Sequence, residues 1–140
     1  MPRADFYLID KPRFREEPLL LVCELARKAF ASEQPTVIFA RSQDQAEEID
    51  ARLWEFSEDA FIPHQIAGDD DDAITAVLIV PPGIEVDDRP LAINLRDSCA
   101  FGNHSRILEV VAADPSERDG SRRRWKEYLK RGFELSKHDM

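Results

Sequence analysis

The segment near the C-terminus combines basic and aromatic side chains at helical spacing. Trp125, Tyr128 and Leu129 recur at i, i+3 and i+4, and Arg122 and Lys126 lie four positions apart beside them. Arginine and lysine can hold carboxylates, and aromatic rings can hold an apolar anchor. The pattern predicts either an amphipathic helix that packs its rings on a sheet, or a docking surface for an acidic peptide that contains an aromatic residue.

Nucleic acid is a third interpretation of the same helix, because basic and aromatic side chains together also suit single strands. The chain as a whole carries a formal charge of −9, with an acidic run at 69–72. A net negative charge disfavours non-specific attraction to DNA and to anionic lipid. The overall charge therefore weighs against a direct nucleic-acid binder.

Side chains that could catalyse a reaction are few and scattered. Cys99 and His104 could form a nucleophile–base pair only if the fold brought them into contact. Cys23 and Cys99 otherwise fit reduced, buried thiols, and His64 fits a hydrogen bond at its own turn. An uncharacterised enzyme that uses Cys99, His64 or His104 stays an alternative, while the preferred interpretation has no catalytic residue.

Sequence motifs for nucleotides and metals are missing. The five glycines include no Gly-x-Gly pair and no Gly-Lys-Ser/Thr. Phosphate-cradling loops need such glycines because backbone N–H groups must approach the phosphates closely. Structural zinc needs paired ligands at short spacing, whereas the three histidines stand singly. We therefore expect no nucleotide site, no metal site and no cofactor.

Alternating strands and helices are predicted to position these side chains. Apolar runs predict strands at 6–9, 36–40, 76–80 and 91–95, while 107–111 fits a strand or a helix. Helices are predicted from 18 to about 31, from 42 to about 56 and from 114 to about 131, with a loop at 11–17. This alternation favours a parallel α/β sheet in one domain over 1–140.

No targeting or membrane segment is visible. The first residues lack the charged stretch and long apolar run of a signal peptide. The longest apolar run, Leu19–Cys23, is far shorter than the roughly 20 residues that a membrane span needs. We expect a soluble, cytoplasmic protein.

Short stretches over nearly the whole chain have a characteristic order and spacing. They are Phe6–Ile9, Leu21–Ala26, Leu53-Trp54, Phe61–His64 with Ala67-Gly68, Ile93–Arg96, Glu109–Val111, and Arg124–Tyr128 with Gly132-Phe133. In these stretches the sequence resembles the chi subunit of bacterial DNA polymerase III holoenzyme, an accessory protein of the clamp-loader complex. The resemblance implies a three-layer Rossmann-like α/β fold with a mainly parallel central sheet and no nucleotide-binding loop.

The resemblance also implies a non-catalytic adaptor of DNA replication with two protein partners. One partner is the acidic C-terminal tail of single-stranded DNA-binding protein. The other is the psi subunit, which links chi to the clamp loader. DNA would then be reached only indirectly, and no membrane contact is expected.

The contact residues that the resemblance implies lie in two parts of the chain. Positions that match the family's tail site on the last helix are Arg122, Arg124, Trp125, Lys126 and Tyr128. Positions that match the psi contact are Phe61, Pro63 and His64. Trp125 stands where the family has a tyrosine, which keeps an aromatic ring but changes its shape and hydrogen bonding. The loop at 69–72 is shorter and more acidic than the family pattern.

Overall fold

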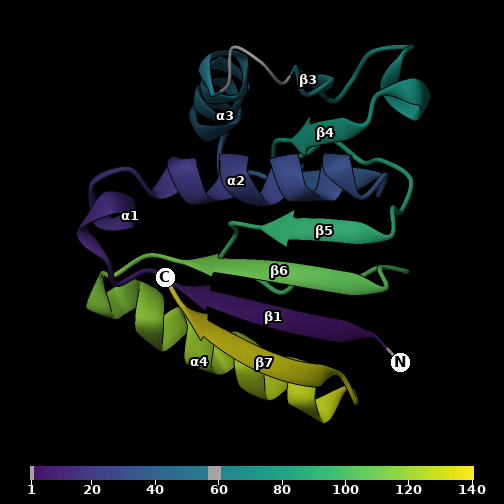
Figure 1. Cartoon of the computed structure of the whole chain (residues 1–140). Helices are drawn as coiled ribbons and strands as arrows, with labels where there is room; N and C mark the ends of the chain where they lie inside the picture. The colour runs from purple at the N-terminus through teal and green to yellow at the C-terminus, as the bar shows by residue number, and fades with distance from the viewer. Residues whose placement is uncertain (1, 57–60) are drawn as a thin grey trace.

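Seven parallel strands form one sheet in the computed structural model, which describes residues 2–56 and 61–140 (Figure 1). In the order in which they lie side by side, the strands are β3 (His64–Ile66), β4 (Val77–Val80), β2 (Thr36–Phe39), β5 (Leu91–Asn94), β6 (Arg106–Val111), β1 (Arg3–Leu8) and β7 (Glu134–Asp139). Every neighbouring pair is parallel. The predicted α/β fold with a parallel central sheet is confirmed.

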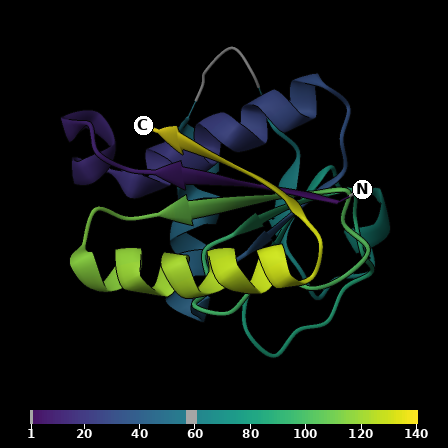
Figure 2. The ribbon, with the colours of Figure 1, turned by 90° about the horizontal axis from the view of Figure 1, so that it is seen from below.

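Helices cover both faces of this sheet, as Figure 2 shows from below. In the described residues they are α1 (Pro12–Glu16), α2 (Pro18–Ala31), α3 (Gln43–Glu55) and α4 (Pro115–Lys130), with a short 3-10 turn, η1, at Asp72–Ile74. α2 and α3 pack into one core and α4 into the core on the opposite face, which gives three layers. None of these helices is long and apolar enough to cross a membrane.

The central strands are covered on both faces, which explains their unbroken apolar sequences. Val37 and Ile38 are successive residues of β2, and they enter opposite cores because side chains alternate along a strand. β4 and β5 are buried at every position. Residues 106–111 form β6, so the open alternative between strand and helix at 107–111 is resolved in favour of the strand.

The helix ends follow the predicted signals. Pro18 begins α2, and the Ser42 hydroxyl accepts a hydrogen bond from the backbone N–H of Gln45 (3.1 Å) at the start of α3. The Gln45 side-chain oxygen accepts from the backbone N–H of Arg41 (2.7 Å), one residue earlier than in the usual capping box. Gly132 has a φ of 85° and ends α4, as expected for a glycine after a helix.

Four of the described elements were not predicted, namely α1, β3, η1 and β7. The expected loop at 11–17 was wrong, because Pro12 begins the short helix α1 and Phe14 anchors it in the core. The strand β7 is polar and largely accessible, so it lacks an apolar signal in the sequence. It is an edge strand beside β1, where charged side chains are common. Its position matters because it borders the site described next.

Candidate protein-binding sites

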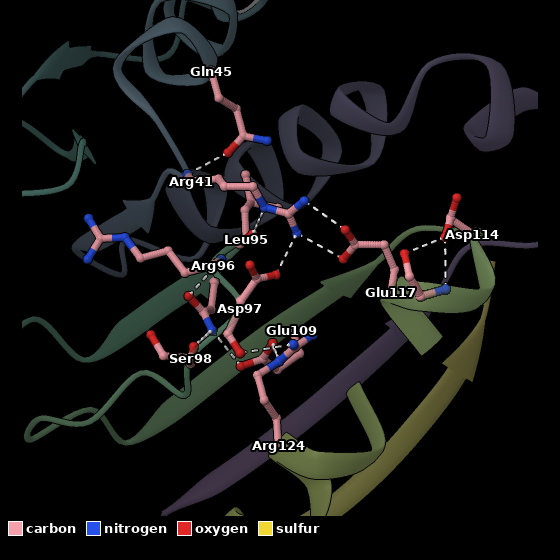
Figure 3. Close-up of polar contacts among 12 residues, drawn as sticks. Arg41, Gln45, Leu95, Arg96, Asp97, Ser98, Glu109, Asp114, Glu117 and Arg124 are labelled. Carbon is pink, nitrogen blue, oxygen red and sulfur yellow. Dashed lines mark hydrogen bonds and ion pairs between the residues drawn. The ribbon is translucent and has the colours of Figure 1, made fainter. Parts of the chain in front are cut away.

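α4 is attached to the sheet through a buried carboxylate on β6. Arg124 Nε donates to Oε1 of Glu109 (2.9 Å), and the Tyr128 hydroxyl donates to Oε2 (2.6 Å). Asn94 Nδ2 also donates to Oε2 (2.8 Å). Burial raises the pKa of Glu109, while the Arg124 guanidinium and the two neutral donors oppose that rise. Both oxygens of Glu109 are therefore occupied from within the protein, and Figure 3 shows this carboxylate facing Arg124.

This attachment places two of the five predicted tail-site residues beneath the surface. The exposed fraction is 4% for Arg124 and 0% for Tyr128. The Arg124 guanidinium also donates to the carbonyl oxygen of Asp97 (3.3 Å). The expected direct contact of Arg124 and Tyr128 with a tail is therefore corrected. Both side chains are buried and have an internal role. They hold α4 against the sheet.

The other three predicted tail-site residues, Arg122, Trp125 and Lys126, come together at one groove between α4 and the edge of the sheet. The groove has a volume of about 440 Å³. Its lining is Phe6 and Leu8 from β1, Arg118, Ser121, Arg122, Trp125 and Lys126 from α4, and Lys137 from β7. The site is thus built from three elements that are far apart in the sequence.

The groove combines apolar and basic surfaces. Phe6 and Trp125 lie with their ring centroids 5.1 Å apart and supply its apolar base together with Leu8. Cationic side chains come from both flanking elements, as a row at spacing four on α4 and as Lys137 on β7. Among the described residues that line the groove, none is acidic. Such a groove suits an anionic ligand with an apolar group.

Two basic residues of the lining, Arg118 and Lys137, were not predicted from the sequence. Arg118 lies one helical turn before Arg122, so the row at spacing four already contained the signal. Lys137 belongs to the unpredicted strand β7. No pattern in the sequence connects it with α4, because only the sheet register brings it opposite Phe6.

A second candidate surface lies at the opposite edge of the sheet, where α3 ends and the chain enters β3. Trp54 and Phe61 are 59% and 60% exposed, and their ring centroids are 5.2 Å apart. Large apolar side chains that are exposed together are typical of interaction sites. Phe61 was predicted as a psi-contact residue. Trp54 was not, although it lies beside it.

The other two predicted psi-contact residues are less accessible. Pro63 is partly buried, and the His64 side chain is fully covered. His64 Nδ1 lies 2.6 Å from the carbonyl oxygen of Ile62, and Nε2 lies 3.2 Å from that of Asp50. The predicted hydrogen-bonding role of His64 at its turn is confirmed. Its ring also packs edge-on against Trp54, with a centroid distance of 5.1 Å, so it supports the exposed aromatic pair from below.

The aromatic pair lies in acidic surroundings. The exposed acidic residues of α3 are Asp44, Glu47, Glu48 and Glu55. Arg52 is the basic residue of this helix, and its guanidinium is already paired with Glu17 (3.1 Å). The two candidate surfaces therefore carry opposite charge.

The carboxyl ends of the central strands, where α/β proteins commonly bind nucleotides, are occupied by paired side chains (Figure 3). Arg41 donates to both carboxylate oxygens of Glu117, at 2.7 and 2.8 Å, and lies 3.4 Å from Asp97. Arg96 donates to the carbonyl oxygens of Ala40 (2.9 Å) and Val80 (2.8 Å). These guanidinium groups already have protein partners.

The candidate nucleophile and bases are engaged elsewhere. The Cys99 thiol lies 3.7 Å from the carbonyl oxygen of Arg124, while His104 Nδ1 lies 2.7 Å from that of Arg89. No hydrogen bond joins Cys99 to His104 within the part of the chain that the structure describes. Burial raises the pKa of the Cys99 thiol to about 11, which keeps it protonated at neutral pH. This geometry gives no support to a cysteine–histidine enzyme.

Comparison with known sequences identifies one family. The family described as "DNA polymerase III chi subunit, HolC" matches residues 1–136. DNA polymerase III subunit chi of Pseudomonas aeruginosa is 36% identical over 99% of this chain and 96% of its own length. The subunit of the same name from Escherichia coli is 30% identical over 97% of both chains.

Comparison with solved structures identifies the same general fold in proteins of low sequence identity. The C-terminal domain of the DEAD-box protein Dbp5 superposes with a TM-score of 0.66 at 13% identity, covering 99% of this chain and 90% of that domain. T4 UvsW superposes with a TM-score of 0.62 at 9% identity, covering 99% of this chain and 41% of that protein. At such identities these similarities describe the fold alone.

Proposed function

The chain belongs to the DNA polymerase III chi subunit family and so has a role in DNA replication, where we propose that it is a non-catalytic adaptor. Its partners are the acidic C-terminal tail of single-stranded DNA-binding protein and the psi subunit, through which it reaches the clamp loader. The observation that carries the proposal is the basic groove between α4 and β7, with its apolar base.

The tail of single-stranded DNA-binding protein fits this groove chemically. An acidic strand that ends in phenylalanine and a free carboxylate needs an apolar slot and cations around it. Phe6, Leu8 and Trp125 supply the slot, and Arg122 and Lys126 are exposed beside it. A handful of such contacts typically yields micromolar affinity, about −8 kcal/mol. Part of that affinity is charge attraction, so binding weakens with salt.

The psi subunit is assigned to the opposite edge, at Trp54 and Phe61. Exposed aromatic side chains are typical anchors of protein interfaces, and these two present a joint surface. Pro63 and His64 contribute by fixing the chain that carries Phe61. The acidic face of α3 nearby favours a partner segment that combines apolar and basic side chains.

The tail assignment is tested by titrating a labelled acidic peptide that ends in phenylalanine. Wild type should bind it saturably, and Lys126→Ala should weaken binding by about tenfold, because a charge-assisted contact is lost. Lys130→Ala is the matched control, since Lys130 is an exposed lysine of α4 outside the groove. Equal affinities for wild type and Lys126→Ala would place the tail elsewhere.

A single-stranded oligonucleotide in the same titration addresses the second candidate function. The row of cations and Trp125 favour nucleic acid chemically. The net charge of −9 opposes it. Tight oligonucleotide binding at physiological salt, with no binding of the peptide, would replace the adaptor proposal with direct binding of single strands.

A further inference from the structure

We propose that Lys137 of β7 is a specificity-determining residue of the groove. Lys137 and Lys126 together hold the terminal carboxylate of the tail. The inference rests on the proposed function and names the contact that distinguishes a chain end from an internal acidic stretch. Lys137 is the one cation that reaches the described groove from outside α4.

The register of the sheet places Lys137 at the groove. Lys137 is the neighbour of Phe6 in the parallel pairing of β1 with β7. Neighbouring residues in a sheet project to the same face. Phe6 belongs to the core beneath α4, so Lys137 projects toward α4 as well. Its exposed side chain therefore faces the helix across the apolar base.

The four cations that line the groove differ in how freely they can take a new partner. The Arg118 guanidinium donates to the carbonyl oxygen of Ile9 (2.5 Å), and that of Arg122 is paired with Asp119 (3.0 Å). Within the described residues, neither Lys126 nor Lys137 forms an ion pair with a carboxylate. The two lysines therefore have their whole ammonium groups available for an incoming carboxylate, whereas each arginine already directs one of its N–H groups to a protein partner.

The positions of the two lysines suit a chain end. Lys126 lies on α4 and Lys137 on β7, with the rings of Phe6 and Trp125 also lining the groove. A C-terminal phenylalanine carries its carboxylate on the same carbon as its side chain. When the ring lies on the apolar base, the carboxylate therefore stays close to it and can meet both ammonium groups. An internal phenylalanine has an uncharged peptide carbonyl at that point.

The test compares two versions of the peptide, one with a free C-terminal carboxylate and one with a C-terminal amide. Wild type should bind the free acid about tenfold more tightly than the amide, since the amide removes a charge-assisted contact. In Lys137→Met the preference should fall to about threefold or less, because the apolar stem remains but the ammonium group is gone. Lys137→Arg keeps a cation at this position and should retain the preference for the free acid. Lys130→Met should leave that preference at the wild-type value.

The outcomes separate this inference from the proposed function. If wild type binds the free acid and Lys137→Met keeps the full preference over the amide, Lys137 does not hold the carboxylate and the inference is wrong. The same holds if Lys137→Met weakens both peptides equally, since that is general charge attraction. If folded wild type binds neither peptide, the tail assignment fails, and the inference fails with it.

Discussion

The α4 groove and the Trp54–Phe61 surface lie at opposite edges of one sheet, beside β7 and β3. The groove is basic and recessed, whereas the aromatic pair is exposed and borders the acidic face of α3. Distant sites that share no residues are expected to act independently. Under the proposed assignments, the chain would therefore hold two partners of different chemistry at once.

The support beneath the two surfaces also differs. α4 is held by the buried ion pair of Arg124 with Glu109, and both carboxylate oxygens of Glu109 accept hydrogen bonds inside the protein. The aromatic pair rests on His64, whose ring nitrogens lie near backbone carbonyl oxygens of Ile62 and Asp50. Breaking the support of α4 leaves a buried charge, so the groove depends more strongly on the integrity of the core.

The largest effect is expected from Arg124→Ala. The substitution leaves Glu109 buried without its cation, which should lower the free energy of unfolding by about 3–5 kcal/mol. Arg122→Ala, two positions away on the exposed side, should change it by no more than about 0.5 kcal/mol. Urea unfolding measures both. Similar losses for the two variants would contradict the division of α4 into an internal and an external face.

A large effect on one partner alone is expected from Trp54→Ala and Phe61→Ala. Each should weaken psi binding by about 2 kcal/mol, or roughly thirtyfold, and leave the affinity for the tail peptide unchanged. Ile74→Ala is the matched control, because Ile74 is an exposed apolar residue elsewhere, at 84% exposure. Calorimetric titration with psi measures the change. A loss of tail binding in Trp54→Ala would show that the two surfaces are coupled.

Salt should weaken the affinity for the tail more than the affinity for psi, by several-fold rather than by orders of magnitude. Raising the ionic strength from about 0.1 M to about 1 M shortens the Debye length from about 10 Å to about 3 Å. The tail affinity should fall several-fold, since cations line the groove. Psi binding should fall less, because its proposed anchors are uncharged rings. An equal salt dependence at both sites would contradict this contrast.

The smallest effect is expected on the free energy of unfolding, from the ion pair that joins the loop after β2 to the first turn of α4. The hydrogen bond from Arg41 lowers the pKa of Glu117 below its ordinary value of 4.5. A carboxyl whose pKa is lower in the folded state stabilises the protein above its unfolded pKa, and this contribution is lost as the pH falls through the folded value. Solvent reaches Arg41, so the contribution is at most about 1 kcal/mol.

Glu117→Gln tests this pair. The variant should be slightly less stable than wild type at pH 7, and the difference should shrink as the pH falls below about 4.5. Thermal unfolding across that range measures it. A difference that stays constant with pH would mean that Glu117 acts through packing and not through its charge.

The sequence predicted the strands and helices with clear apolar periods, and it failed where the signal is polar. β7 carries charged and polar residues because it is an edge strand, so both the seventh strand and Lys137 escaped prediction. In α4, basic and aromatic residues follow one helical pattern. The pattern alone does not separate Arg122 and Trp125 at the groove from Arg124 and Tyr128 in the interior. That division depends on Glu109, fifteen residues before Arg124, and only the fold brings it beneath α4.

One molecule of the protein is proposed to hold both partners, and formation of a ternary complex is the measurement that decides this. The protein would be bound to immobilised psi subunit, and full-length single-stranded DNA-binding protein would then be added. We expect a further increase in bound mass with psi retained, and no increase with a single-stranded DNA-binding protein that lacks its acidic tail. Displacement of the protein from psi would contradict simultaneous binding of the two partners, and equal binding of the tailless form would contradict recognition of the acidic tail.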